Sequence, residues 1–285
     1  MGEAITLPHG YWIEGRHCRE VSLRGLTGRD EEFLSQSSRS VLPIMVRAND
    51  LLARCVERMQ GHEAVTRSAV VALVAGDRET LLWQLRRLTL GERLQPSLQC
   101  PAEACGRPMD LTLSLSDLQQ PPYADPRPEY RSERGGLSIR FRLPTGADLE
   151  ALCGGVSTEE GAEAAAERLL ERCILGVYQN DRALEEWPPE GLAAVPALME
   201  ELDPQAETLL QVTCPECGTA FPALLDAAGY LFGEIAGQAD DLYRQVHSLA
   251  LHYHWSEAEI LGLSPVKRRR YLELLSDSLS EAESP

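Results

Sequence analysis

Cys100-Pro-Ala-Glu-Ala-Cys105-Gly106 and Cys214-Pro215-Glu216-Cys217-Gly218 are the two stretches that decide the fold. In both, a proline follows the first cysteine and stiffens a tight turn. A glycine follows the second cysteine, where the backbone has to bend its amides toward sulfur. Strand-like segments flank each pair. The pattern therefore predicts two β-hairpin knuckles whose cysteines face one ion.

Cys100, Cys105, Cys214 and Cys217 have the number and type of side chain that hold structural zinc in a tetrahedral site. We expect Zn²⁺ as a structural cofactor in a zinc ribbon of two β-hairpin knuckles. Four thiolates leave no open position for water, so we expect no catalysis at the ion. The alternatives are a redox pair, which needs a strand–CxxC–helix context, and plain thiols.

Composition narrows the class of protein. The chain has 285 residues, of which 44% are hydrophobic and only 6% aromatic, so its core is built mainly from aliphatic side chains, which suits helices. The net charge of −17 repels nucleic acid and anionic membranes. We see no signal peptide and no membrane helix, and no motif for a small-molecule substrate. We therefore expect a cytoplasmic protein.

In the reducing cytoplasm, the isolated cysteines are expected to be thiols: Cys18, Cys55, Cys153 and Cys173.

Outward from the knuckles, periodicity predicts mostly helices. We expect helices over 44–59, over 78–90 with Asp77 as the cap, and over 158–178, separated by alternating strands near 111–115 and 139–143. Thr145-x-x-Asp148 repeats the helix start seen at Thr27-x-x-Asp30. Beyond the two cysteine pairs we see no internal repeat.

These elements predict an α+β fold, mainly helical, in five segments. They are an N-terminal strand and helical region (1–93), the first knuckle hairpin (94–118), an inserted α+β subdomain (119–206), the second knuckle hairpin (207–226) and a C-terminal helical region with an acidic tail (227–285).

The C-terminal region holds the candidate partner-binding residues. Trp255 is a large amphipathic anchor. Ser256 and Glu259 form a capping box for the helix that follows. We expect a partner surface that consists of Trp255, Ile260, Leu261, Arg268 and Arg269. The alternative is that Trp255 is buried in its own domain and that the basic run 267–270 is a solvated face. His247, His252 and His254 do not share one helical face, so they are expected to be a helix end rather than a metal site.

Several segments together resemble the T4-type phage baseplate hub assembly proteins of contractile tails. They are Leu26-Thr27-Gly28-Arg29-Asp30-Glu31-Glu32, Gly76-Asp77-Arg78-Glu79 leading into 85–91, Arg142-Leu143-Pro144-Thr145-Gly146-Ala147-Asp148-Leu149, and the two cysteine knuckles. Relatives of that family also look to be encoded with phage-derived contractile injection systems. His252-Tyr253-His254-Trp255-Ser256-Glu257-Ala258-Glu259-Ile260-Leu261 resembles a helical motif of phage tail assembly chaperones.

The resemblance implies a non-enzymatic baseplate hub component or assembly chaperone. Its partners would be baseplate hub, spike or tape-measure proteins, and its location the cytoplasm or an assembled tail or injection-system particle. The rival hypotheses are a zinc-ribbon nucleic-acid-binding or regulatory module, which the acidic charge opposes, and a zinc enzyme, which needs an open coordination position.

Overall fold

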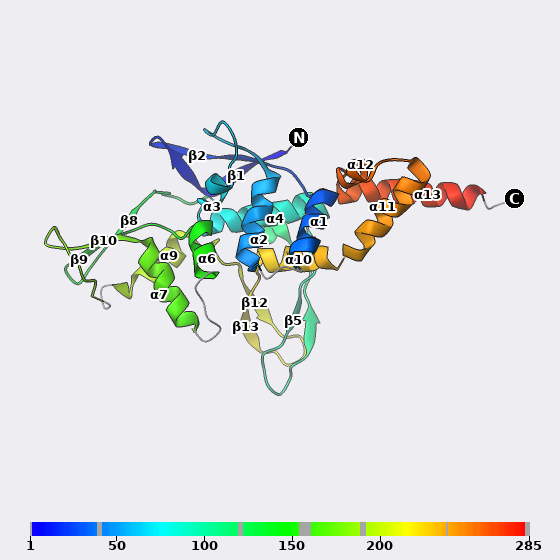
Figure 1. Cartoon of the computed structure of the whole chain (residues 1–285). Coiled ribbons are helices and arrows are strands. Elements are labelled where there is room, and N and C mark those ends of the chain that lie inside the picture. The colour runs from blue at the N-terminus through cyan, green and yellow to red at the C-terminus, as the bar shows by residue number, and fades with distance from the viewer. Residues whose placement is uncertain are drawn as a thin grey trace.

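The computed structural model describes residues 2–38, 42–118, 122–153, 161–188, 192–237 and 239–282. Helices and small antiparallel sheets alternate along the chain, so the protein is α+β as the sequence predicts. Figure 1 shows three units in a row, with two hairpins projecting from the middle. None of the described helices is long and apolar enough to cross a membrane.

The first unit lies at the centre of the row and is a three-stranded sheet with two helices. Its sheet has the order β1-β2-β3. The helix predicted over 44–59 ends at Cys55, because the next four residues pair with β2 instead. The elements are β1 (Glu3–Ile13), β2 (Arg16–Leu23), α1 (Gly28–Ser38), α2 (Ile44–Cys55) and β3 (Val56–Met59).

A helix–turn–helix completes the first unit. It consists of α3 (Arg67–Val71), capped by the Thr66 hydroxyl, and α4 (Ala75–Leu90). The predicted cap of α4 is wrong. The helix begins at Ala75 without a side-chain cap, and Asp77 already lies in its first turn, where the carboxylate accepts amide hydrogens from β1.

The second unit has its own sheet, in the order β11-β10-β9-β8, and its own core around Phe141. The helix predicted over 158–178 is only partly correct. Residues 158–160 lie outside the described part of the chain, and the helix ends at Cys173 because β10 pairs with β9. The elements are β8 (Tyr130–Arg134), β9 (Leu137–Phe141), α6 (Gly146–Cys153), α7 (Ala162–Cys173), β10 (Ile174–Gln179), β11 (Arg182–Ala183) and α9 (Val195–Leu202).

A buried carboxylate fixes the corner between β2 and α1. Asp30, whose side chain is 1% exposed, accepts hydrogen bonds from both Arg24 and Arg54 and from the amide and hydroxyl of Thr27. The Arg24 guanidinium also donates to the Arg54 carbonyl, and the Arg24 amide donates to the carbonyl of Cys55. We call this set the Asp30 clamp.

The second unit contains the same clamp, atom for atom. Asp148 accepts from Arg142, from Arg172 and from the amide and hydroxyl of Thr145, and the Arg142 amide donates to the Cys173 carbonyl. Every member stands the same number of positions after its counterpart in the Asp30 clamp. The strand–strand–helix–helix–strand order is also the same. The expectation of no internal repeat beyond the cysteine pairs is therefore wrong.

The C-terminal unit repeats the helix–turn–helix. Its helices are α11 (Ala239–Tyr253), α12 (Glu257–Leu261) and α13 (Pro265–Ala282). Like α3, α12 has five residues and a hydroxyl cap, here with the predicted capping box of Ser256 and Glu259. The turns to α4 and to α13 also have the same length.

The first residue of α1 or of α6, the helices held by the two clamps, contacts the turn of the neighbouring unit's helix–turn–helix. The Gly28 amide of the first unit donates to the Leu263 carbonyl, and the Gly146 amide of the second unit donates to the Leu73 carbonyl, both at 3.1 Å. A Cβ on Gly28 would lie 3.0 Å from the Cα of Leu261, and one on Gly146 would lie 3.1 Å from the Val71 carbonyl oxygen. Both positions therefore require glycine because the helices approach too closely for a side chain.

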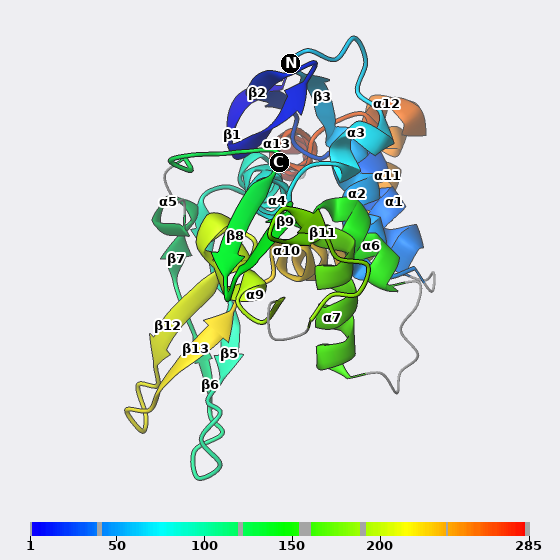
Figure 2. The same cartoon turned by 90° about the vertical axis from the view of Figure 1, so that its left-hand side faces the viewer.

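A fully buried arginine accompanies each of these contacts. The Nε of Arg78 donates to Asn49 of α2, and the Nε of Arg268 donates to Gln245 of α11. The second unit thus docks on the first in the way that the first docks on the C-terminal unit. Figure 1 shows this order along the row, and Figure 2 views the row from its end, with the second unit in front.

The two knuckles are hairpins, but they do not form the predicted zinc ribbon. The strands β5 (Ser97–Gln99) and β6 (Pro108–Asp110) make one two-stranded sheet, β12 (Leu209–Thr213) and β13 (Ala220–Leu224) make another, and no strand pairing joins the two. The fold class is corrected accordingly. The sheets also carry more of the fold than a mainly helical protein implies, since β1 and β2 alone have 11 and 8 residues.

Three short elements and one helix connect the hairpins to the units. The helix α10 packs on α1 and α4 and completes the core of the first unit. The elements are β4 (Arg93–Leu94), β7 (Leu113–Ser114), α5 (Leu115–Leu118) and α10 (Ala227–Ala236).

The clamps predict matched losses of stability. Burial alone would raise the pKa of Asp148, but hydrogen bonds from Arg142 and Thr145 lower it to about 2. Because this pKa lies below that of the unfolded chain, the clamp stabilises the fold above about pH 4, and the stabilisation is lost as the pH falls toward 2. At pH 7 we expect Asp148→Asn and Asp30→Asn each to lower the free energy of unfolding in urea by about 2–4 kcal/mol.

The control is Glu129→Gln, which removes an ion pair with Arg140 in which both side chains are nearly half exposed. It should cost less than about 1 kcal/mol. If Asp148→Asn costs no more than this control, the clamp does not have the role assigned here.

Candidate metal centre

The four predicted ligands meet at the tips of the two hairpins. The Sγ atoms of Cys100, Cys105, Cys214 and Cys217 all lie within 4.8 Å of one another. Sγ of Cys100 lies 3.6 Å from that of Cys217, and Sγ of Cys105 lies 3.9 Å from that of Cys214. Each knuckle thus supplies two sulfurs, and the closest contacts run between the knuckles.

The hairpins hold these sulfurs in place through local backbone bonds. The Cys100 amide donates to the Arg107 carbonyl, and the Cys214 amide donates to the Thr219 carbonyl. Gly106 and Gly218 have φ of 54° and 75°, in the left-handed region that favours glycine. The role predicted for the glycine after each second cysteine is therefore confirmed.

The spacing fits a tetrahedral ion and does not fit disulfides. Sulfurs at about 2.3 Å from zinc lie about 3.8 Å apart in a tetrahedron. A disulfide would bring two sulfurs to about 2.05 Å. The Thr219 hydroxyl and amide lower the pKa of Cys217 to about 6, whereas burial and the neighbouring thiols raise the pKa of Cys100 and of Cys105, so one thiolate forms most readily in the cluster. The donor set could hold zinc, cross-link two distant segments and leave no position for a reacting water.

The other cysteines and the histidines do not join this cluster. Among the described residues, the four knuckle cysteines form the one group of metal-ligating side chains close enough to share an ion. The thiols of Cys55 and Cys173 are completely buried next to the clamps. The remaining side chains lie elsewhere, with the histidines exposed: Cys18, Cys153, His247, His252 and His254.

The predicted partner surface is mostly engaged within the chain. Ile260 and Leu261 are buried in the core of the C-terminal unit. Arg268 is 1% exposed, and its guanidinium donates to Glu31 of α1 at 2.6 Å. Trp255 is half-buried, and its ring lies 4.9 Å from that of Tyr253. Arg269 is exposed. The apolar helix behind the cap suggested a surface role for Ile260 and Leu261, and the basic run 267–270 suggested one for Arg268. Neither pattern distinguishes an intramolecular neighbour from a partner.

The sequence also gave no sign of a charged cluster buried between the units. Asp77 accepts the amides of His9 and Gly10, both at 2.8 Å. Asp203 of the second unit accepts the Gly76 amide and the Tyr123 hydroxyl. A run such as Gly-Asp-Arg-Glu at a helix start suggests solvated caps. Its burial depends on distant segments, because Asp77 accepts amides of β1 and the Gly76 amide donates to Asp203.

Burial also changes the charge of this cluster. It raises the pKa of Asp77 to about 7, against the effect of the two amides. It raises the pKa of Glu79 to about 7 as well, with Arg78 opposing and Asp226 adding to the shift. These carboxyls are satisfied by the protein itself, so we assign them a structural role between the units.

The described part of the chain thus consists of repeated units docked head to tail, with four cysteines gathered at the tips of two hairpins. Comparison with known protein families identifies the family to which the chain belongs. The family model described as T4 bacteriophage base plate protein matches residues 15–228, well over half of the chain. The chain therefore belongs to this family, and its role is that of a structural protein of a phage baseplate. No curated protein and no solved structure matches it.

Glu79 predicts a pH-dependent contribution to stability. Its pKa in the folded protein lies above the ordinary value of 4.5, so the carboxyl takes up a proton on folding near neutral pH. The stabilisation that Glu79 gives relative to Gln is complete below about pH 4.5 and is lost as the pH rises toward 7. We expect the free energy of unfolding of the wild type, minus that of Glu79→Gln, to fall by roughly 2–3 kcal/mol between pH 5 and pH 8.

Urea denaturation at several pH values measures this difference. Both proteins carry the same cysteines, so acid effects on these thiols cancel. Curves that stay parallel across the range would contradict the burial of Glu79 as an acid with a raised pKa.

Proposed function

We propose that this chain is a non-enzymatic hub component or assembly chaperone of a contractile phage tail or contractile injection system, stabilised by one structural zinc ion. The observation that carries the proposal is the convergence of four cysteines from two distant segments within a chain of the baseplate family. A closed four-thiolate site supplies stability rather than a reactive water. Its partners are the baseplate hub, spike or tape-measure proteins.

Zinc would act as a staple between sequence-distant segments. The first hairpin follows α4 of the first unit, and the second hairpin follows α9 of the second unit. The hairpins also share a small apolar cluster that includes Met109 and Val212, and an exposed ion pair between Arg107 and Glu216 adds little at their tips. A metal cross-link here restrains a long stretch of unfolded chain, so it stabilises the arrangement of both units.

If zinc cross-links the two hairpins, a variant that cannot hold the ion should also be less stable. Wild-type protein should hold one zinc per chain by elemental analysis, and Cys214→Ser should hold none. We expect the free energy of unfolding to fall by at least about 3 kcal/mol, since structural zinc binds with about 10–16 kcal/mol.

Cys153→Ser is the matched control, because Cys153 lies outside the cluster and a serine hydroxyl can still donate to the Leu149 carbonyl. It should keep both zinc and stability. An unchanged melting temperature after complete zinc removal would show that the ion is no staple.

The C-terminal unit is the region we assign to partner binding. It lies beyond the residues matched by the family model, and it resembles the tail assembly chaperones. The half-buried ring of Trp255, packed on Tyr253 and Tyr271, leaves an amphipathic edge at its surface. Of the predicted basic contacts, Arg269 is the exposed one. The net charge of −17 gives no support to nucleic acid as the partner.

Co-purification tests the hub role. Tagged protein, co-expressed with the hub and tape-measure proteins encoded beside it, should retain at least one of them. Arg269→Glu should reduce the recovered amount several-fold, because it reverses a charge on the proposed surface. Arg182→Glu, at an exposed site on β11, is the control and should bind as the wild type does. Recovery of neither partner by the wild type would overturn the proposal.

A further inference from the structure

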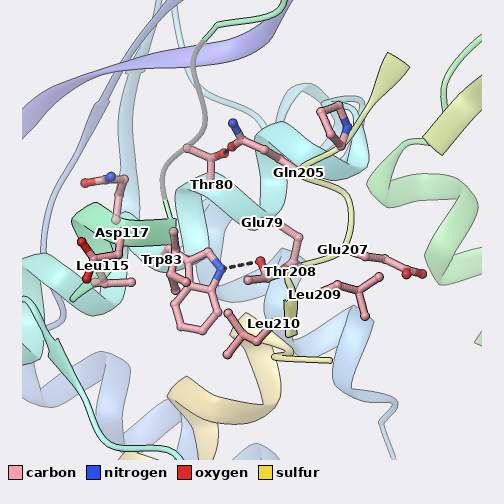
Figure 3. Close-up of a pocket in the computed structure, with 13 residues that line it drawn as sticks. Glu79, Thr80, Trp83, Leu115, Asp117, Gln205, Glu207, Thr208, Leu209 and Leu210 are labelled. Carbon is pink, nitrogen blue, oxygen red and sulfur yellow. Dashed lines mark hydrogen bonds between the residues drawn. The ribbon is translucent and has the colours of Figure 1, made fainter. Parts of the chain in front are cut away.

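A pocket opens between α4 of the first unit and the segment that leads from α9 into β12. Its volume is about 160 Å³, and its walls come from α4, α5 and residues 204–210. Figure 3 shows Trp83 at its centre, with Asp117 and Glu207 on opposite sides. The volume suits one side chain and is too small for a helix.

Two exposed acids line the pocket. Asp117 and Glu207 contribute carboxylates, whereas Glu79 is buried beside Arg78 with a raised pKa, and no Lys or Arg is among the described lining residues. The neighbouring arginines of α4 have partners of their own. Arg78 lies 3.6 Å from Glu79, and Arg87 donates to Gln84 and pairs with Glu3. A cation entering the pocket would therefore meet the negative charge of Asp117 and Glu207 from two opposite sides.

The walls are held rigid by hydrogen bonds across the two units. The indole nitrogen of Trp83 donates to the Thr208 hydroxyl at 3.3 Å. The Thr80 hydroxyl donates to the Gln205 side chain at 2.7 Å. An aromatic ring and fixed oxygen acceptors thus stand together in a preformed site, which lowers the cost of ordering it around a ligand.

An exposed apolar pair lies beside the pocket. Leu209 lines the pocket and is 57% exposed, and its cross-strand partner Leu224 is 58% exposed. These two large aliphatic side chains form an exposed apolar patch next to the acidic pocket. A ligand that covers both would combine a cation with an apolar neighbour.

We propose that this pocket binds an arginine side chain of a partner protein, with an apolar residue beside that arginine packed on Leu209 and Leu224. A guanidinium is flat, weakly hydrated and rich in donors, so it suits a site that combines an indole with several separated oxygen acceptors. Charge-assisted hydrogen bonds to carboxylates are the stronger kind. The site needs no zinc chemistry and no particular hub partner, so it stands apart from the proposed function.

A small probe tests the pocket on the whole chain. The probe is N-acetyl-Leu-Arg-amide, and its neutral isostere is N-acetyl-Leu-citrulline-amide. Binding is followed by the indole NH resonance of Trp83 in ¹⁵N-labelled protein, assigned with Trp83→Phe. We expect the arginine probe to shift this resonance saturably with a millimolar Kd and the citrulline probe to bind at least about fivefold more weakly.

Two double variants locate the interaction. Asp117→Asn with Glu207→Gln removes the rim carboxylates and should weaken the arginine probe by about threefold or more. Asp181→Asn with Glu185→Gln removes two exposed acids of the second unit and should leave binding unchanged. The proposal is overturned if the two probes bind equally, if neither shifts the resonance by about 10 mM, or if the rim variant binds as the wild type does.

Discussion

The hydrogen bonds accepted by two buried carboxylates, Asp30 and Asp148, are the constraint on which the rest of the structure depends. Each carboxylate ties the end of a strand, the start of a helix and the end of the next helix into one corner. An unpaired buried carboxylate would be costly, so the arginines and the threonine have to stay in place. The same corner then presents Gly28 or Gly146 to the neighbouring unit at a distance that admits no side chain.

This repeated contact orders the whole molecule. Because the second unit docks on the first and the first docks on the C-terminal helices, the chain is a short head-to-tail array rather than one core with insertions. Where the second unit docks, Asp203, which follows α9, accepts the Gly76 amide of α4 and is buried. The docking also sets the two hairpins side by side, so that their four cysteines can share one ion.

The sequence predicted the local chemistry better than the arrangement. The cysteine spacing indicated the knuckles, the glycine conformations and the grouping of the four ligands, because these follow from a few adjacent residues. It did not indicate that the hairpins stay separate sheets, since strand pairing depends on distant segments. Helix–strand boundaries at Cys55 and Cys173 were missed because apolar residues continue across them with no change in helical spacing.

The repeat could have been found from the sequence. Thr27-x-x-Asp30 recurs as Thr145-x-x-Asp148, and Leu51-Leu52-x-Arg54-Cys55 recurs at the same distance as Leu169-Leu170-x-Arg172-Cys173. Burial of Ile260 and Leu261 could not have been found, because an apolar helical face looks the same whether it packs within the chain or on a partner.

X-ray absorption at the zinc edge of purified protein tests the central claim most directly, because it reports the ligands of the ion that joins the units. The account predicts four sulfur neighbours at about 2.3 Å and no lighter ligand. A spectrum with nitrogen or oxygen in the first shell, or protein without zinc that still holds its hairpins together, would contradict it.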